Sequence, residues 1–245
     1  MKQEIPKTIF GIEVSGAIER ALAEQNPKNK IPEGENSTQS KIINFNDYWR
    51  IEGVDYNQKT GIYELSKELI PSATQEELAQ LSKLSRENGG FYAGDARLHY
   101  AIFKAIKQAG NTEIRDFVRE KLRSSYPNTL TRVRYQPSGN DEVIHNYKQK
   151  DESSFTGRVI GPDREINEED KECLEILLGA KDIKEIKEVS GFINGTRTYI
   201  WRVNSIPKNL DERVVRFDAY SDWLSLYCYR DPSDQFPAFG VREVL

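Results

Sequence analysis

The chain has 245 residues but little of what most catalytic sites use, with two histidines, two cysteines and one methionine. Cys173 and Cys228 are too few for a disulfide framework or a four-cysteine zinc site, and we expect both to be buried as small apolar side chains. The sequence contains no nucleophile elbow, no glycine-rich phosphate loop and no EF-hand pattern. It therefore predicts a protein that is not an enzyme, with no catalytic residue, no metal site and no cofactor.

An excess of basic residues is also lacking. Lysine and arginine number 35 against 39 aspartates and glutamates, for a formal net charge of −4. Nucleic-acid binding depends on neutralising phosphates, so we expect no nucleic-acid partner. No apolar run is long enough to span a bilayer, and the N-terminus has acids on both sides of a short apolar patch, unlike a signal peptide. Localisation and oligomeric state are left open.

Hydrophobic and charged residues, at 37% and 30%, are typical of a folded globular chain. We expect an arm and linker over 1–38, with a short helix near 12–23, and one domain over 39–245. Hydrophobic periodicity, turn residues and caps predict the elements of that domain. The predicted order is a strand over 41–57, helices beginning near Thr74 and over 95–109 and 112–124, a strand near 129–135, a helix capped by Asn167, and a strand over 190–204 with a hairpin turn at Asn194-Gly195. This order predicts the α+β class.

The C-terminal stretch "FDAYSDWLSLYCYRDPSDQFPAFGVREVL", residues 217–245, mixes many aromatic rings with Ser, Asp, Arg and Pro. Within 224–229, apolar and polar residues alternate, as in a strand with two different faces. Leu224, Leu226 and Cys228 then face the core, and Ser225, Tyr227 and Tyr229 face outward. An aromatic-rich sandwich core with polar turns remains the alternative at this point.

Tyrosine, tryptophan and arginine dominate the energetics of binding surfaces, while serine and aspartate supply adaptable hydrogen bonds. We therefore expect the outward side chains to form a preformed ligand-binding surface rather than a deep pocket. The same alternation predicts that Trp201, Val203, Leu224, Leu226 and Phe239 are largely buried. The predicted ligand-binding residues are Phe217, Asp218, Tyr220, Asp222, Trp223, Ser225, Tyr227, Tyr229, Arg230, Asp231, Ser233, Asp234 and Phe236.

A frame surrounds this stretch. "YIWRVNSIPK" and "ERVV" precede it, and "PAFGVR" follows it near the chain end. The arrangement resembles the variable proteins of diversity-generating retroelements, and among them the archaeal members most. In that family a reverse transcriptase copies a template repeat with errors at adenines, and the copy replaces the 3′ end of the target gene.

The resemblance implies a C-type-lectin-like domain, of the kind shared with formylglycine-generating enzymes, with antiparallel C-terminal strands and packed helices. It also implies a diversified region at about 217–236 that displays variable side chains to a macromolecular or cell-surface ligand. In phages such proteins attach to host surfaces. Most of the predicted ligand-binding residues are reachable from an AAY codon by mutation at adenine, whereas Trp223 and Gln235 are not.

Two other functions stay open. The aromatic stretch is also compatible with a structural protein, such as a virion component, in which it forms a fixed subunit interface. An enzyme of the sulfatase-modifying type is the third hypothesis. The enzymatic relatives work through a cysteine pair, and here Cys228 faces inward by the alternation above.

Overall fold

A computed structural model describes residues 8–9, 12–13, 40–158, 163–195, 197–202 and 207–244. Over these ranges the chain is α+β, as the sequence predicts, with helices packed on a large mixed sheet. Most of the expected N-terminal arm lies outside the described residues. The exceptions are two short paired strands, β1 (Thr8–Ile9) and β2 (Ile12–Glu13), so the helix expected near 12–23 does not begin at Ile12.

The remaining elements begin at residue 41 and follow one another closely. Their bounds are β3 (Lys41–Asn44), β4 (Tyr48–Tyr56), β5 (Lys59–Ala73), α2 (Gln75–Glu87), β6 (Tyr92–Ala93), α3 (Ala96–Ala109), α4 (Thr112–Ser124), β7 (Asn128–Tyr135), β8 (Asp141–His145), β9 (Ser153–Arg158), β10 (Arg164–Glu165), the 3-10 turn η1 (Glu168–Asp170), α5 (Lys171–Leu178), α6 (Ile183–Asn194), β11 (Arg197–Arg202), β12 (Asp211–Ala219), β13 (Trp223–Arg230) and β14 (Phe236–Val244).

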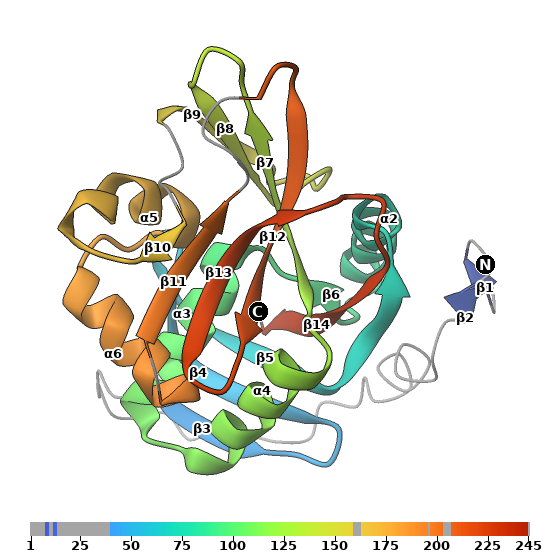
Figure 1. Cartoon of the computed structure of the whole chain (residues 1–245). Helices are drawn as coiled ribbons and strands as arrows, with labels where there is room; N and C mark the ends of the chain where they lie inside the picture. The colour runs from blue at the N-terminus through green and yellow to red at the C-terminus, as the bar shows by residue number, and fades with distance from the viewer. Residues whose placement is uncertain are drawn as a thin grey trace.

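A twelve-stranded mixed sheet organises the fold, with its main path in the order β10-β11-β13-β12-β7-β14-β5-β4-β3. Strands β8 and β9 extend from β7 as a meander, and β6 pairs with β14. Figure 1 looks onto one face of β11, β13 and β12, with α3 behind them and α5 and α6 at the left. Helix α3 therefore covers the far side of these three strands in this view.

The helices begin where the sequence supplies caps. Thr74 and Glu77 form the expected capping box at α2, and Asn111 accepts hydrogen bonds from the backbone at the start of α4. Asp95 caps α3 in the same way through the Leu98 backbone N–H. Each cap satisfies amides that have no partner inside the helix, so these starts follow from local chemistry.

The core lies between α3 and the inner face of the sheet. The Phe103 ring of α3 meets the Phe217 ring of β12 edge-on, with the ring centroids 5.1 Å apart. Phe239 of β14 packs against the rings of His99 and Phe117, which come from α3 and α4. These contacts bear out the expectation that the helices over 95–109 and 112–124 pack on the C-terminal strands.

Two local predictions were wrong. Asn194-Gly195 is not a hairpin turn: α6 ends there, with Gly195 at a φ of 69° as its left-handed cap. Hairpin turns and helix ends both use residues that tolerate positive φ, so the dipeptide alone does not separate them. In addition, the C-terminal strands are not all antiparallel, because β11 runs parallel to β13 while β12 pairs antiparallel with it.

Where the structure describes the chain, no helix is long and apolar enough to cross a membrane.

Candidate functional site

The outer face of β11, β13 and β12 carries the candidate site, called here the aromatic face. The register sets Tyr199 and Asp218 on either side of Ser225, and sets Trp201 opposite Tyr227 on the neighbouring strands. Because side chains alternate along a strand, alternate residues of all three strands share this face. The full set is Arg197, Tyr199 and Trp201 of β11, Trp223, Ser225, Tyr227 and Tyr229 of β13, and Arg216 and Asp218 of β12, with Tyr220 just beyond it.

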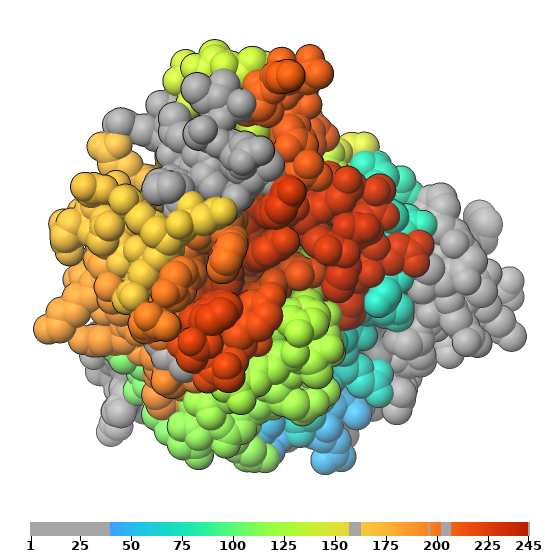
Figure 2. Space-filling model, in the orientation of Figure 1, coloured from blue at the N-terminus to red at the C-terminus, as the bar shows by residue number. Residues whose placement is uncertain are grey.

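Several large rings of this face are open to solvent. Tyr229 is 45% exposed, and Trp201 and Tyr220 are each 36% exposed. In Figure 2 the orange and red surface of the C-terminal strands occupies the centre of the view. Exposed rings gathered on one face are unusual for a protein without a partner.

The rings also support one another. Trp223 lies between Tyr199 and Tyr220, with ring centroids 5.7 Å and 5.2 Å away, and Tyr227 and Tyr229 are 6.1 Å apart. These separations fall in the range of favourable aromatic pairs. A ring that already packs on its neighbour loses little rotational freedom on binding, so the face is ordered before any ligand arrives.

Arg216 occupies the centre of the face. Its Nε and Nη2 contact the two carboxylate oxygens of Asp218 at 2.8 Å and 3.0 Å. The rings of Tyr126, Tyr227 and Phe236 surround its guanidinium, with centroids 5.3, 5.0 and 4.6 Å from Cζ. Burial raises the pKa of Asp218, and the Arg216 charge opposes that shift. The pair is a buried cation and anion within β12, and the rings that pack on the cation come from β13 and β14.

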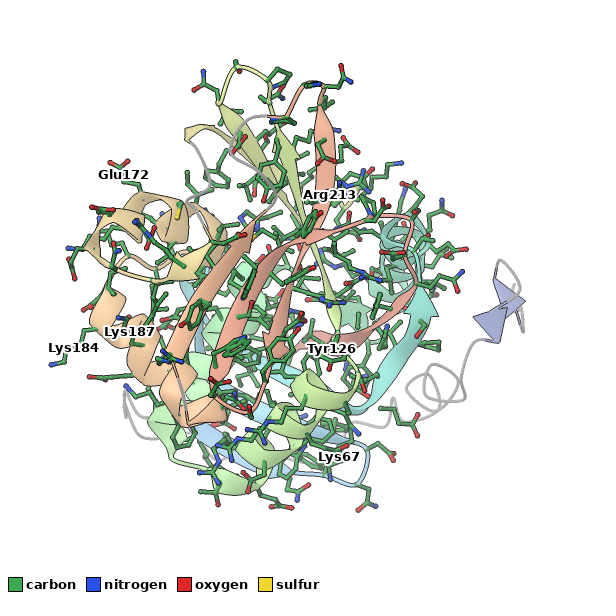
Figure 3. All side chains as sticks on the ribbon, in the orientation of Figure 1. Lys67, Tyr126, Glu172, Lys184, Lys187 and Arg213 are labelled. Carbon is green, nitrogen blue, oxygen red and sulfur yellow. The ribbon has the colours of Figure 1, made fainter. Side chains whose placement is uncertain are left out.

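Charge pairs are repeated around the rim. Arg197 contacts Asp222 at 3.4 Å, and Arg230 contacts Asp234 at 2.9 Å while its guanidinium lies over the Phe236 ring. Arg213 contacts Asp231 at 3.4 Å. In Figure 3, Arg213 and Tyr126 are labelled at opposite ends of the exposed sheet face. Each of these arginines has an aspartate beside it, so the face is nearly neutral and does not favour a highly charged ligand.

The turn from β13 to β14 is held in one conformation. The Asp231 carboxylate accepts hydrogen bonds from the Ser233 backbone N–H at 2.9 Å and from its hydroxyl at 2.7 Å, which lower the Asp231 pKa. The Pro232 carbonyl accepts a hydrogen bond from the Gln75 backbone N–H at the start of α2. A side-chain-supported turn anchored to a helix is a fixed platform for Asp231, Ser233 and Asp234.

Three predicted site residues lie differently from what the sequence suggested. Phe217 faces the core and is only 5% exposed, because it alternates with Arg216 and Asp218 along β12. Asp218 and Ser225 do belong to the outer face, but neighbouring side chains cover both completely. Tyr220, Asp222, Tyr229, Asp231 and Ser233 are exposed, and Trp223, Tyr227, Arg230, Asp234 and Phe236 are partly exposed.

Burial was predicted correctly for Leu224, Leu226 and Phe239, and wrongly for Trp201. Val203 lies outside the described residues. Trp201 is exposed because Ile200, and not Trp201, takes the inward position of β11 opposite Leu226. Alternation through Tyr199 and Trp201 would have placed both rings on the outer face, so the signal was present in the sequence.

Several polar atoms under the aromatic face have no hydrogen-bond partner within the described part of the chain. They are the Ser225 hydroxyl, the Trp223 indole N–H, Arg216 Nη1, both amide atoms of Asn128, and Arg216 Nε and Asp218 Oδ1, which are in ion-pair contact but are not aligned for a hydrogen bond. Asn128 lies directly opposite Arg216 on β7 and is fully buried. Asn128, Arg216 and Tyr126 were not predicted as site residues, because all three lie outside the C-terminal stretch 217–245.

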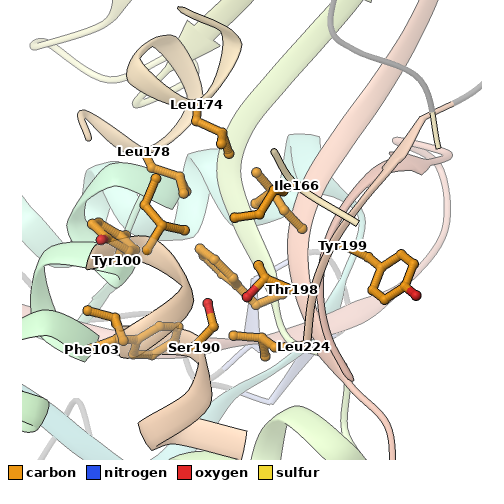
Figure 4. Close-up of a pocket in the computed structure, with 13 residues that line it drawn as sticks. Tyr100, Phe103, Ile166, Leu174, Leu178, Ser190, Thr198, Tyr199 and Leu224 are labelled. Carbon is orange, nitrogen blue, oxygen red and sulfur yellow. The ribbon is translucent and has the colours of Figure 1, made fainter. Parts of the chain in front are cut away.

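Behind the aromatic face, a narrow apolar cavity of about 10 Å³ lies between β11, α5 and α6. Figure 4 shows the Ser190 and Thr198 hydroxyls turned toward each other inside it, while Tyr199 points away on the other side of its strand. A cavity of this size holds about one water molecule and no larger ligand.

Both histidines are buried. His145 is buried, with Nε2 2.8 Å from the Ile176 carbonyl and Nδ1 3.0 Å from the Thr131 hydroxyl, so both ring nitrogens are occupied. His99 is buried beside the Phe239 ring, and burial lowers its pKa to about 4. Cys173 and Cys228 are buried on α5 and β13 and form no disulfide with each other. The described residues contain no group of three or more His, Cys, Asp or Glu arranged to hold a metal ion.

Comparisons of the chain with known protein families, with curated proteins and with solved structures find no match.

Proposed function

We propose that the aromatic face binds a macromolecular ligand and that gene diversification changes its outer residues. The observation that carries this proposal is the set of exposed rings on one ordered, charge-balanced sheet face, with Trp201, Tyr220 and Tyr229 at its surface. Large rings with few rotatable bonds give contact area at low entropic cost. The face is broad, and the cavity of about 10 Å³ beneath it is too small for a ligand. Such a surface suits a protein or cell-surface ligand better than a small molecule.

The proposal includes a C-type-lectin-like fold and membership of the retroelement variable proteins. The C-terminal strand β14 pairs antiparallel with β5 along most of its length, which supports a rigid frame behind the diversified stretch. The conformation of the β13–β14 turn depends on Asp231, Ser233 and backbone contacts rather than on the exposed rings. Ring identity can therefore change without moving the chain.

The genetic part of the proposal has a direct test in the DNA beside the gene. We expect a near-copy of the segment encoding about residues 215–242, differing from it only at adenines, together with a reverse-transcriptase gene. A neighbourhood with no such copy would remove diversification from the proposal and leave a binding face of fixed sequence.

The binding part is tested separately by selection. Randomising Tyr220, Asp222, Tyr227 and Tyr229 in a display library and selecting on one folded protein should yield binders whose backbones superimpose over 217–242. Backbone shifts well beyond about 1 Å among selected variants would contradict a preformed face. A matched library at the exposed α6 positions Lys184 and Lys187 should yield no binders.

A fixed subunit interface is the second candidate, because exposed aromatic rings with paired charges also suit self-association. In that case the protein is an oligomer in solution, and Tyr229→Asp, alone or with Trp201→Asp, dissociates it. Sedimentation at several concentrations separates the candidates, since a display protein keeps its oligomeric state when these rings are replaced.

A further inference from the structure

A second concave region lies away from the aromatic face and shares no residue with it. It is a cleft of about 1190 Å³ along α3, bounded by the β4–β5 turn on one side and by the α5–α6 connection on the other. Helices α5 and α6 are at the left of Figure 1, with α3 behind the sheet. One stripe of α3 lines the cleft, with the small side chain of Ala101 among larger ones.

Arg97 is the unusual charge in this cleft. Its guanidinium is partly buried and has no carboxylate oxygen within 4.0 Å among the described residues. It donates to the backbone carbonyls of Ile176 at 2.9 Å and Glu175 at 3.3 Å, and it lies over the Phe155 ring at 4.1 Å. Desolvation lowers the Arg97 pKa. Neutral carbonyls and a ring therefore fix the position of this cation, and the carboxylates of Asp95 and Glu175 oppose the shift only from beyond ion-pair distance.

Tyr100 supplies a second group to the same cleft. It lies three residues after Arg97 on α3, so the two side chains are neighbours on one helix face. Its ring is 4% exposed, and its buried hydroxyl has no hydrogen-bond partner in the described part of the chain. A buried hydroxyl without a partner is unfavourable unless something in the cleft accepts its hydrogen bond.

Most of the other charges of the cleft already have partners, and Lys59 is exposed at its edge. Lys104 pairs with Glu185 at 2.7 Å, and Lys181 pairs with Glu175 at 3.3 Å. Asp182 caps α6 through the backbone N–H groups of two residues, and the Asp55 carboxylate accepts a hydrogen bond from Thr60. Arg97 thus differs from the rim charges, since it is partly buried and has no carboxylate of the described ranges in direct ion-pair contact, although Asp95 and Glu175 act on its charge from further away.

We propose that this cleft binds a small anionic ligand, with a carboxylate or phosphate group on the Arg97 guanidinium and a hydrogen bond from the Tyr100 hydroxyl. Arginine's planar fork suits both anions, and the position fixed by Phe155 and the α5 carbonyls reduces the entropy lost on binding. The Phe155 ring and the apolar part of the cleft would contact the remainder of the ligand. This site does not depend on the function of the aromatic face.

The test uses the full chain and nuclear magnetic resonance of the arginine Nε–H groups. The Arg97 Nε–H donates to Ile176, which slows its exchange with water and favours detection. Inorganic phosphate and succinate are titrated in separate arms, with sodium chloride at matched ionic strength as the reference. We expect a saturable shift of the Arg97 signal with at least one of the two anions, and the arm that saturates identifies the anion class.

Four variants make the result specific. Arg97→Gln should abolish saturation, Tyr100→Phe should weaken binding roughly tenfold through loss of one charge-assisted hydrogen bond, and the exposed control Lys184→Gln should leave it unchanged. Thermal melts show whether Arg97→Gln folds. If it does not, Arg97→Lys takes its place as the test, and because it keeps the charge it should retain weak binding. Shifts that only follow ionic strength, or saturation that persists in Arg97→Gln, would overturn the proposal.

Discussion

Replacing Phe217 by alanine tests which side of β12 belongs to the aromatic face. Phe217 is 5% exposed, and its ring packs edge-on against Phe103 with the centroids 5.1 Å apart. Truncating a buried phenylalanine costs about 3–5 kcal/mol, because the transfer free energy of the ring is lost and a cavity remains. For a chain of this size, 1 kcal/mol shifts the midpoint by about 2–4 °C, so the Tm should fall by roughly 6–20 °C.

The matched control is Tyr229→Ala, an equally large aromatic truncation on the exposed side of the neighbouring strand. Tyr229 is 45% exposed and contacts the Tyr227 ring and the Arg213 guanidinium, whose Cζ lies 5.2 Å from its ring centroid. Such exposed contacts contribute about 1 kcal/mol or less, so the Tm should fall by no more than about 4 °C. Circular-dichroism melts of both variants measure the difference. A larger loss for Tyr229→Ala than for Phe217→Ala would refute the assignment of the two faces.

Two further predictions concern buried charge. Asp218→Asn leaves Arg216 buried without a carboxylate and should lower the free energy of unfolding by about 3–5 kcal/mol. The double change Arg216→Met with Asp218→Leu removes both charges and should lower it less. Urea titration measures both variants, and a double variant less stable than the single one would contradict the pairing. His99 has a pKa of about 4 in the folded state against about 6.5 in the unfolded state. Between these values the unfolded state binds more protons. The free energy of unfolding should therefore fall by up to about 3 kcal/mol as the pH is lowered from 6.5 to 4. Unfolding of wild type and His99→Leu across that range should give a smaller loss for the variant, and equal losses would show that His99 does not contribute.

The parts of the fold that the sequence predicted are those governed by short-range chemistry. Thr74 with Glu77 and Asn111 gave correct helix starts, because a cap needs only a side-chain oxygen at the right spacing from free amides. Alternation in 224–229 gave the correct faces for Leu224 and Leu226, because a strand has only two sides. Neither inference needs knowledge of what packs against the element.

The parts that it missed depend on distant partners. Asn128 enters the site because β7 pairs with β12, and nothing near residue 128 indicates that pairing. Ser225 was correctly placed on the outer face but is covered by side chains from neighbouring strands, which alternation along one strand does not reveal. The parallel pairing of β11 with β13 arises from the path of the chain between them. Sequence periodicity assigns a face, but the identity and size of cross-strand neighbours decide exposure.

The distinction between covered and open positions also limits which residues of the aromatic face can vary under the proposed function. Replacing Asp218 by a residue without a carboxylate leaves the Arg216 cation buried among rings, and a larger residue at Ser225 would displace the side chains that cover it. The rim is different, since Arg197 and Asp222 are exposed, and a surface pair contributes about 1 kcal/mol or less. Diversification can therefore exchange rim residues at little cost to stability, while Arg216 and Asp218 keep the strands beneath them in place. A face built in this way separates the residues that select a ligand from the residues that hold the fold.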